Sequence, residues 1–548
     1  MKQSPSFVPA AKRFTPIIKN APLAATLLAA GLMTACSSSS DSNDASISGT
    51  IVAGPVNGAE VSVVDGSGNE VVAPVTTDAD GKYSLAIPNG SLGQDLIVKS
   101  SGGSFTDEAT LNSGTAGDMY AYMPAGSISN SNTVSVTPGS SIVAQLVMDH
   151  GMTMAEASDA FEDAFAYTPD VSVDPADATT APAADETEDE TLAGFRAGAF
   201  SQLANDLGLS QDDQFELFAA LAQDLSDEKL DGVDASGVVA IGATGESLEA
   251  DIQNRFSMAL VNFRNNPNNL TGLDNDEIGD IPFAKVALTD KYQIEYKPLS
   301  MMAPVNGKDS FQIHVTNRID GSDAPGLTNM LMPMMYMLNG YMHSTPMPAP
   351  AITDDGNGLY TVTLYYLMPT AMGGYWDLNF MIDGEEMHFY PTVMMAMEGA
   401  DTPQVRLYGV DDQVMTMTGM AGRTYFIFKE SLQMNGPGNY GFSVFIAAME
   451  TMMSFPAVYD GSVLDGNTLG VTVDIDDGNG WKPANDSSKD GIWSVSGLSL
   501  TDGVADEIRV RVSVNDNNGI DEYKTTDGEQ RVEDVNDFQT FTVTPGGM

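Results

Sequence analysis

The chain has 548 residues, of which 75 are acidic and 24 are basic, so its formal net charge is −51 at neutral pH. A surface this acidic repels nucleic acid and anionic lipid headgroups, so we expect no nucleic-acid partner. Cys36 is the single cysteine, so the chain forms no internal disulfide and must be stabilised by buried apolar side chains, to which bound ions could add.

The first 36 residues are typical of an export signal. A basic segment precedes the apolar run 21–35, which is too short to span a membrane, and the run ends at Cys36. This end resembles the lipobox of bacterial lipoprotein precursors, with Met33 where the family usually has leucine. The resemblance implies cleavage before Cys36 and lipidation of its thiol. Since Ser37 follows rather than aspartate, it also implies the outer membrane, facing the periplasm or the cell exterior. The alternative is an ordinary secretory signal with a chance cysteine.

Beyond a polar tether (36–46), short alternating apolar runs separated by Gly- and Asp-rich turns predict an antiparallel β-sandwich over 47–134. Segments 47–52, 58–63 and 77–85 resemble the carboxypeptidase regulatory-like β-sandwich, which implies a spacer or adhesion module. Turn chemistry alone explains Asp78 and Asp80 in the last of these segments.

From residue 135 to 280, apolar residues recur at spacings of three and four and predict a small helical bundle. An acidic Ala/Thr/Pro-rich passage, 168–190, interrupts it as a loop. Strand-like sequence then returns, which predicts two Ig-like sandwiches over 281–400 and 401–548. The predicted fold class is therefore mainly β and multidomain: a sandwich, a helical bundle and two further sandwiches behind the signal peptide 1–35.

Methionine is the distinctive residue. Of the 32 methionines, 23 lie between Met301 and Met453, and the densest cluster is the segment 330–347. If this segment is extended, Met332 and Met334 point to one face of a sheet, while Met335 and Met337 point to the other. Only one face can pack into a sandwich core, so core packing does not account for all of them.

Thioether sulfur is soft and uncharged at every pH, and it suits Cu(I) better than zinc, magnesium or calcium. One imidazole, that of His343, stands within the cluster and could complete three- or four-coordination. An exported chain with no free thiol also favours methionine as the copper ligand. The alternative is that these methionines are adaptable packing residues or contact a partner.

Segments 332–335, 340–346, 356–364 and 372–378 resemble the YtkA/FixH-like Ig-type domain, which is associated with copper handling. The last motif has one extra residue here. The resemblance implies Met332, Met334, Met335 and His343 as ligands. Met342 precedes the histidine and no second histidine stands nearby, which favours Cu(I). The full predicted copper site comprises Met332, Met334, Met335, Met337, Met342, His343, Met347 and, from a later strand, His388.

Two further interpretations stay open. His388 is alternatively a histidine satisfied by structural contacts. Later methionines, from Met415 to Met453, indicate that the last sandwich shares a Met-rich interface. Ca²⁺ is a second candidate cofactor, because the acidic loops 474–480, 515–521 and 274–280 offer hard oxygen ligands, although none keeps the EF-hand spacing and acidic β-turns are an alternative.

Catalysis has little support, because the metalloprotease, nucleophile-elbow and phosphate-loop motifs are absent from the sequence. We therefore expect no enzyme. The sequence predicts a membrane-anchored lipoprotein that binds copper for storage, delivery or protection, with a copper-receiving protein or another surface protein as partner. The alternative is a structural or adhesive surface lipoprotein with a Met-rich interface and Ca²⁺-binding loops.

Overall fold

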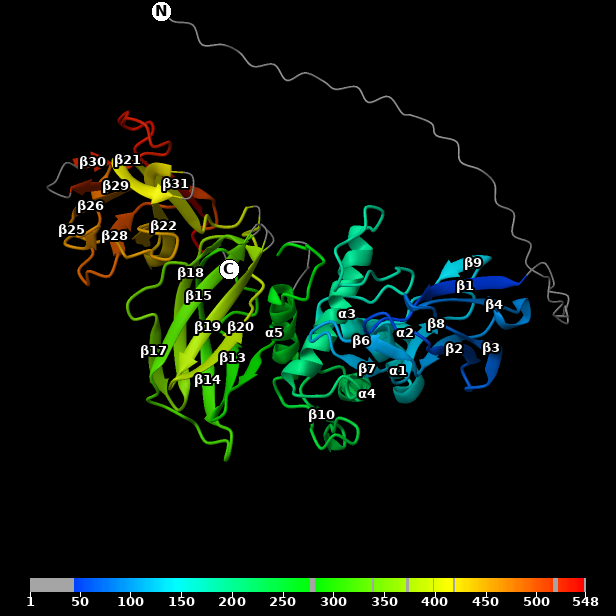
Figure 1. Cartoon of the computed structure of the whole chain (residues 1–548). Coiled ribbons are helices and arrows are strands. Elements are labelled where there is room, and N and C mark those ends of the chain that lie inside the picture. Colours follow the sequence, from blue (N-terminus) through cyan, green and yellow to red (C-terminus); the bar gives the residue numbers. More distant parts are fainter. Residues whose placement is uncertain are drawn as a thin grey trace, which may run out of the picture. The chain divides into compact units, whose positions relative to one another are not determined.

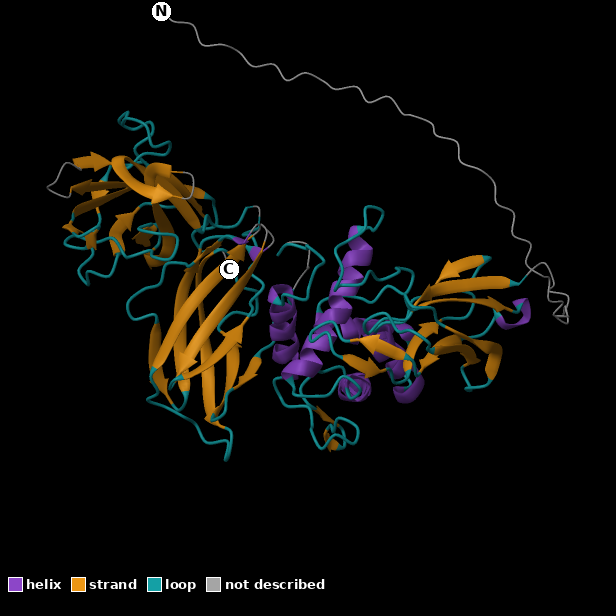
Figure 2. Ribbon diagram, in the orientation of Figure 1, coloured by secondary structure: helices purple, strands orange, loops and turns teal. Residues whose placement is uncertain are grey.

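The structure, a computed structural model, describes residues 44–275, 281–337, 340–370, 374–397, 399–416, 419–515 and 521–546. It is mainly β and multidomain, as predicted: strands form several separate sheets, and the helices fall in one stretch of the chain (Figures 1 and 2). None of the helices within these ranges is long and apolar enough to cross a membrane. Cys36 lies outside the described residues.

The first sandwich has two sheets of order β4-β1-β9 and β3-β2-β5-β8, plus the hairpin β6-β7. Alternate residues of β4 face the core, and the turn before it is held by Asp78, whose Oδ1 accepts the N–H groups of Asp80 and Lys82. Gly81 in this turn has φ of +75°, which favours glycine. The turn interpretation of Asp78 is thus confirmed. The strands are β1 (Ala45–Thr50), β2 (Glu60–Asp65), β3 (Glu70–Thr76), β4 (Lys82–Ile87), β5 (Leu96–Ser101), β6 (Ser104–Thr106), β7 (Ser113–Thr115), β8 (Met119–Met123) and β9 (Ser131–Thr133).

The helical region begins directly after this sandwich. Its first three helices each start with a capping box, in which a threonine (Thr137, Thr153 or Thr187) and the residue three positions later exchange hydrogen bonds. The helices and the first sandwich share one continuous hydrophobic core. The elements are α1 (Pro138–His150), α2 (Met154–Phe165), α3 (Glu188–Asp206), α4 (Gln214–Asp224), α5 (Ile252–Asn265) and the short hairpin β10 (Val233–Asp234) and β11 (Gly237–Val238).

The second sandwich carries the methionine cluster. A five-stranded sheet, β12-β13-β14-β18-β17, faces a four-stranded sheet, β16-β15-β19-β20, across a core that includes Phe311 and Trp376. In Figure 1, β15, β19 and β20 lie side by side. The strands are β12 (Val286–Leu288), β13 (Tyr292–Pro298), β14 (Gly307–Asn317), β15 (Asn329–Met337), β16 (Met342–His343), β17 (Ile352–Gly356), β18 (Leu359–Tyr366), β19 (Gly374–Ile382) and β20 (Glu385–Phe389).

The third sandwich pairs the sheet β21-β22-β23-β28 with the sheet β27-β26-β29-β30, in which β31 also pairs with β29. The two sheets enclose a core that includes Trp493 and Phe541. The strands are β21 (Gln404–Thr416), β22 (Gly419–Gly436), β23 (Asn439–Ala448), β24 (Val463–Leu464), β25 (Asn467–Thr468), β26 (Gly470–Asp476), β27 (Lys482–Pro483), β28 (Ile492–Leu498), β29 (Asp506–Asn515), β30 (Asp521–Tyr523) and β31 (Gln539–Val543).

A buried ionic group ties this sandwich together. The carboxylate of Asp412 accepts hydrogen bonds from Arg423 Nε at 2.9 Å, Tyr425 OH at 2.6 Å and Lys524 Nζ at 3.0 Å. Asp412, Arg423 and Lys524 are all buried. Burial opposes ionisation of Asp412, but the neighbouring cations and the tyrosine hydroxyl hold its pKa below its ordinary value.

Replacing Asp412 with alanine leaves two buried cations without their shared acceptor, so we expect the free energy of unfolding to fall by about 3–5 kcal/mol. Urea denaturation of the full chain measures this. The matched control is Asp411→Ala, because the Asp411 side chain is exposed, and it should change the value by less than about 0.5 kcal/mol. Equal effects of the two substitutions would contradict a buried ionic group.

Candidate metal centre

The alternation of β15 divides its methionines between two faces. Met330 and Met332 are 55% and 44% exposed, whereas Leu331 and Met335 are 5% and 0% exposed. Met334 follows Met332 on the outer face and is half-buried. The prediction that Met332 and Met335 point to opposite faces of the sheet is thus confirmed.

This division separates the predicted ligands. The side chains of Met332 and Met334 lie on the outer face of the sheet, and that of Met335 lies in the core. The structure therefore does not bring the three thioethers together. An ion contacting the outer pair would be separated from Met335 by the strand itself. Of the remaining predicted ligands, Met342 is 48% exposed, and Met337 and Met347 are half-buried against the core of the sandwich.

A smaller group forms on the inner face. His343, in β16, is the cross-strand partner of Met335 in β15, and Met335 in turn is the partner of Trp376 in β19. These three side chains form one row across three strands. His343 is only 5% exposed. Its ring meets Trp376 edge-on, with 5.7 Å between the ring centroids.

Two contacts fix the state of the His343 imidazole. Its Nδ1 lies 2.7 Å from the carbonyl oxygen of Ser344, and its Nε2 lies 3.4 Å from the sulfur of Met368. A carbonyl oxygen can only accept, so Nδ1 carries the proton and donates it. Burial lowers the pKa of the imidazole below its ordinary value, which favours the neutral form. In this neutral tautomer, Nε2 carries no proton and faces the thioether sulfur of Met368.

Met368 is held in place independently of the histidine. It follows β18, and its carbonyl oxygen accepts a hydrogen bond from Trp376 Nε1 at 3.1 Å. Met368 lies in the methionine-rich stretch of the sequence, but it is not among the predicted ligands. His343 and Met368 are 25 positions apart in the sequence, and the pairing of the strands brings their side chains together.

This pair has the chemistry of a soft-metal site. A histidine that ligates a metal through one nitrogen usually donates its other N–H to a carbonyl or carboxylate, as His343 does to Ser344. Typical metal–nitrogen and metal–sulfur distances are about 2.0 Å and about 2.3 Å. One ion lying to the side of the 3.4 Å line can therefore contact both atoms. Among the described residues, no group of three or more His, Cys, Asp or Glu side chains is placed to hold a metal ion.

His388 lies on the other face of the sheet and has a different environment. Its neighbours Met387 and Phe389 point into the core, so its own side chain points outward. Nδ1 lies 2.8 Å from Asp377 Oδ1. Burial opposes protonation, but the hydrogen bond and charge of Asp377 raise the pKa of His388 above its ordinary value. The sheet separates His388 from His343, so it cannot extend the same site.

The acidic loop 474–480 uses its carboxylates within the fold. Asp474 accepts from Arg511 Nε at 3.0 Å, and Asp476 Oδ1 accepts the N–H groups of Gly478 and Gly480. Asp477 pairs with Lys482 at 3.2 Å. The loops 274–280 and 515–521 fall partly outside the described residues, so calcium binding there stays a prediction.

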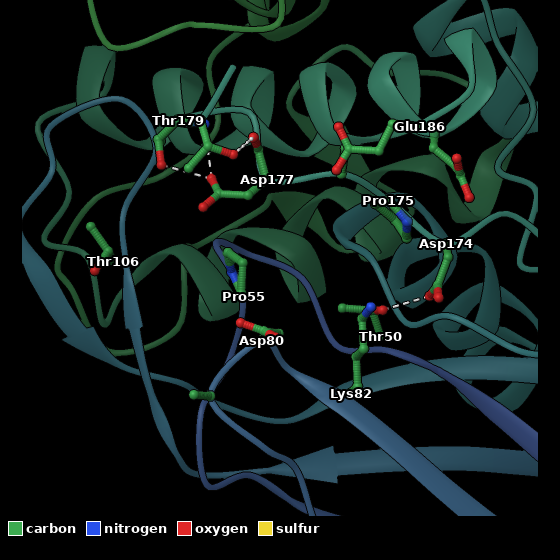
Figure 3. A pocket seen from close by; sticks show the side chains of 14 residues that line it. Thr50, Pro55, Asp80, Lys82, Thr106, Asp174, Pro175, Asp177, Thr179 and Glu186 are labelled. Carbon is green, nitrogen blue, oxygen red and sulfur yellow. Dashed lines mark hydrogen bonds between the residues drawn. The ribbon is translucent and has the colours of Figure 1, made fainter. Parts of the chain in front are cut away.

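A cavity of about 550 Å³ lies between the first sandwich and the segment leading into α3 (Figure 3). Its wall includes five acidic residues and Lys82. Three of the five carboxylates accept local hydrogen bonds: Asp177 from Thr179, Glu186 from Ala183 and Glu190 from Thr187. Asp174 accepts a bond from Thr50, which is far away in the sequence. Three of these carboxylates are thus turn and capping groups, and Asp174 joins its loop to β1, so we assign the cavity no ligand.

No family model matches the chain, and no curated protein matches it. Among solved structures, the chain is similar to the Yersinia pseudotuberculosis adhesin InvE, at 12% identity over 46% of this chain and 57% of the adhesin, with a TM-score of 0.14. Domains 4–9 of the surface layer protein SbsC match at 8% identity over 47% of this chain and 32% of that one, also with a TM-score of 0.14. These scores are too low to assign a shared fold or function. The family resemblances described above stay predictions.

The two histidines should titrate in opposite directions from their ordinary pKa of 6.5: His343 below it and His388 above it. Asp377→Asn should lower the pKa of His388 and leave His343 unchanged, because the sheet separates them. The ring C–H shifts in an NMR titration measure both values. A His343 ring that titrates above 6.5 would contradict the buried, neutral state.

The same substitution should affect stability mainly in acid. Because the pKa of His388 is raised on folding, its pair with Asp377 stabilises the fold fully below the unfolded-state pKa and loses this effect as the pH rises through the folded-state pKa. We expect Asp377→Asn to lower the free energy of unfolding by about 1–2 kcal/mol more at about pH 5.5 than at about pH 8.5. Urea denaturation at both pH values measures the difference.

Proposed function

We propose that this chain is an exported lipoprotein, anchored through Cys36, that binds Cu(I) at His343 and Met368. One observation carries the proposal: Nε2 of His343, the ring nitrogen that carries no proton in the tautomer whose Nδ1 donates to Ser344, lies 3.4 Å from the sulfur of Met368 at the edge of a sandwich core. The nitrogen and the sulfur each have a lone pair, and one soft cation could bind to both.

The donor set favours a monovalent ion. Both donors are neutral, and the histidine is only 5% exposed. The cost of burying an ion rises with the square of its charge, so two neutral ligands offset it far better for Cu(I) than for a divalent ion. The guanidinium of Arg406 also lies near enough to lower the pKa of His343, and its charge opposes a divalent cation more strongly than a monovalent one.

The cellular setting supports the same ion. The signal-like residues 1–36 predict export, and the chain has no cysteine besides the one that would be lipidated. In an oxidising compartment a thioether keeps its ligand character where a thiol would be oxidised. The structural or adhesive lipoprotein remains the second candidate. In that alternative the acidic loops take Ca²⁺, but the carboxylates of loop 474–480 are engaged in internal ion pairs.

Anaerobic Cu(I) titration against a competing chromophoric chelator tests the site. We expect His343→Ala and Met368→Leu each to weaken binding at this site at least tenfold, which corresponds to about 1.4 kcal/mol. The matched control is Met332→Leu with Met334→Leu, which removes two thioethers of the resembled family's ligand set from the outer face. That control should leave the affinity unchanged.

The opposite pattern would overturn the assignment to the inner face. If the outer-face pair abolishes binding and the two inner substitutions do not, the family-derived ligand set is correct. If the chain takes no Cu(I) from the chelator at all, the scaffold function is favoured. Thermal denaturation of each variant without metal separates loss of binding from loss of folding.

The lipid anchor has its own test. In a Gram-negative bacterium, the full chain should fractionate with membranes, and its mature form should carry the mass of a diacylglyceryl group on Cys36. The Cys36→Ser substitution should remove both properties, because the thioether bond to lipid cannot form. Equal fractionation of the two proteins would contradict the anchor without affecting the copper site.

A further inference from the structure

Methionine dominates the exposed apolar surface. Within the described ranges, twelve methionines are among the 24 exposed large hydrophobic side chains, whereas only four methionines are buried. Five of the twelve, which we call the loop methionines, lie on two loops at one end of the second sandwich. They are Met301 (104% exposed), Met302 (71%), Met394 (51%), Met395 (58%) and Met397 (75%).

Backbone hydrogen bonds join these two loops. Met394 donates its N–H to the carbonyl of Pro304 at 2.7 Å, and its own carbonyl accepts from the N–H of Asn306 at 3.0 Å. The side chain of Asn306 accepts a further bond from Ala396 at 3.0 Å. Thioethers more than 90 positions apart in the sequence are therefore held at one place, by contacts that do not involve their side chains.

Two of the loop methionines also converge on one space. Met302 and Met397 line the same cavity of about 690 Å³. The charged groups in its wall are already paired, Lys308 with Glu430 and Lys429 with Asp401. The loop segments 299–306 and 391–397 contain no charged residue, in a chain whose net charge is −51. The thioethers are thus the chemically distinctive groups facing this space.

Apolar character alone does not explain the choice of residue. Burial of apolar area stabilises a fold by roughly 25 cal/mol per Å², and an exposed side chain does not contribute this free energy. Leucine or isoleucine would supply the same surface, yet Leu299 is the only exposed leucine or isoleucine of these two loops. What methionine adds is sulfur, a neutral soft donor.

We propose that the loop methionines form a second soft-cation site, open to solvent, that takes Cu(I) or Ag(I) through thioethers alone. This site does not depend on His343, which lies in the core of the sandwich. It has no imidazole and no thiolate, so it should bind more weakly than the inner site and exchange its ion faster.

Titration of the full chain with Ag(I) as the probe tests the proposal, because Ag(I) is soft and does not change oxidation state under these conditions. Methionine labelled with ¹³C at its methyl group reports each thioether in a ¹H–¹³C spectrum. We expect the five loop methyl signals to shift together once the inner site is filled. In His343→Ala, which lacks the inner site, the same five signals should shift from the first additions of Ag(I).

Two variants make the test specific. The loop variant carries Met301→Leu, Met302→Leu, Met394→Leu, Met395→Leu and Met397→Leu, which keep the apolar surface but remove its sulfur. This variant should bind at least one Ag(I) ion fewer than the unaltered chain. The control variant, Met434→Leu with Met453→Leu, removes two thioethers that are 53% and 54% exposed elsewhere, and it should leave the number bound unchanged.

The proposal is overturned if the loop variant binds as many ions as the unaltered chain, or if all exposed methionines shift alike. Loss of all Ag(I) binding in His343→Ala would also overturn the loop site, and it would still support metal binding at His343. If the loop methionines bind Ag(I) and His343→Ala has no effect on the number of ions bound, the inner site is ruled out and the loop site still stands.

Discussion

The two-residue period of β15 decides what the methionine cluster can do. Successive side chains of a strand point to opposite faces, so a run as dense as 330–337 cannot gather all its sulfurs around one ion. The strand sends Met335 into the core and Met332 to the outside, and the register of β16 sends His343 inward beside Met335. The same constraint leaves room on the inner face for a donor from another part of the chain, and Met368 takes that place.

Charge follows a comparable logic across the molecule. Several of the few basic residues lie in buried or partly buried ion pairs, as in the group around Asp412 and the pairs along β26 and β29. Some carboxylates serve instead as turn and helix caps, as Asp78 and Glu190 illustrate. The carboxylates of the acidic loop 474–480 likewise have partners within the fold.

Periodicity in the sequence predicted the elements well, because helix and strand faces are local properties. The helical spacing over 135–280, the Asp78 turn and the two faces of β15 all depend on residues close in sequence. The meeting of His343 and Met368 depends on the register of β16 against β15 and on the chain path after β18, neither of which a single sequence encodes locally. For the same reason the joined loops around Met301 and Met394 were not predicted, although their methionines were counted.

The structure therefore sorts the methionines into three environments with different chemistry. A thioether such as Met335, packed on all sides, contributes apolar burial and has no room for a further ligand. Met368 is half-buried beside an imidazole lone pair, where an ion would be sheltered from water and released slowly. The loop methionines face solvent, where an ion can enter and leave without any opening of the fold. Capture at an open neutral site and retention at an enclosed one are physically complementary, because the first is limited by diffusion and the second by local motion of the sandwich.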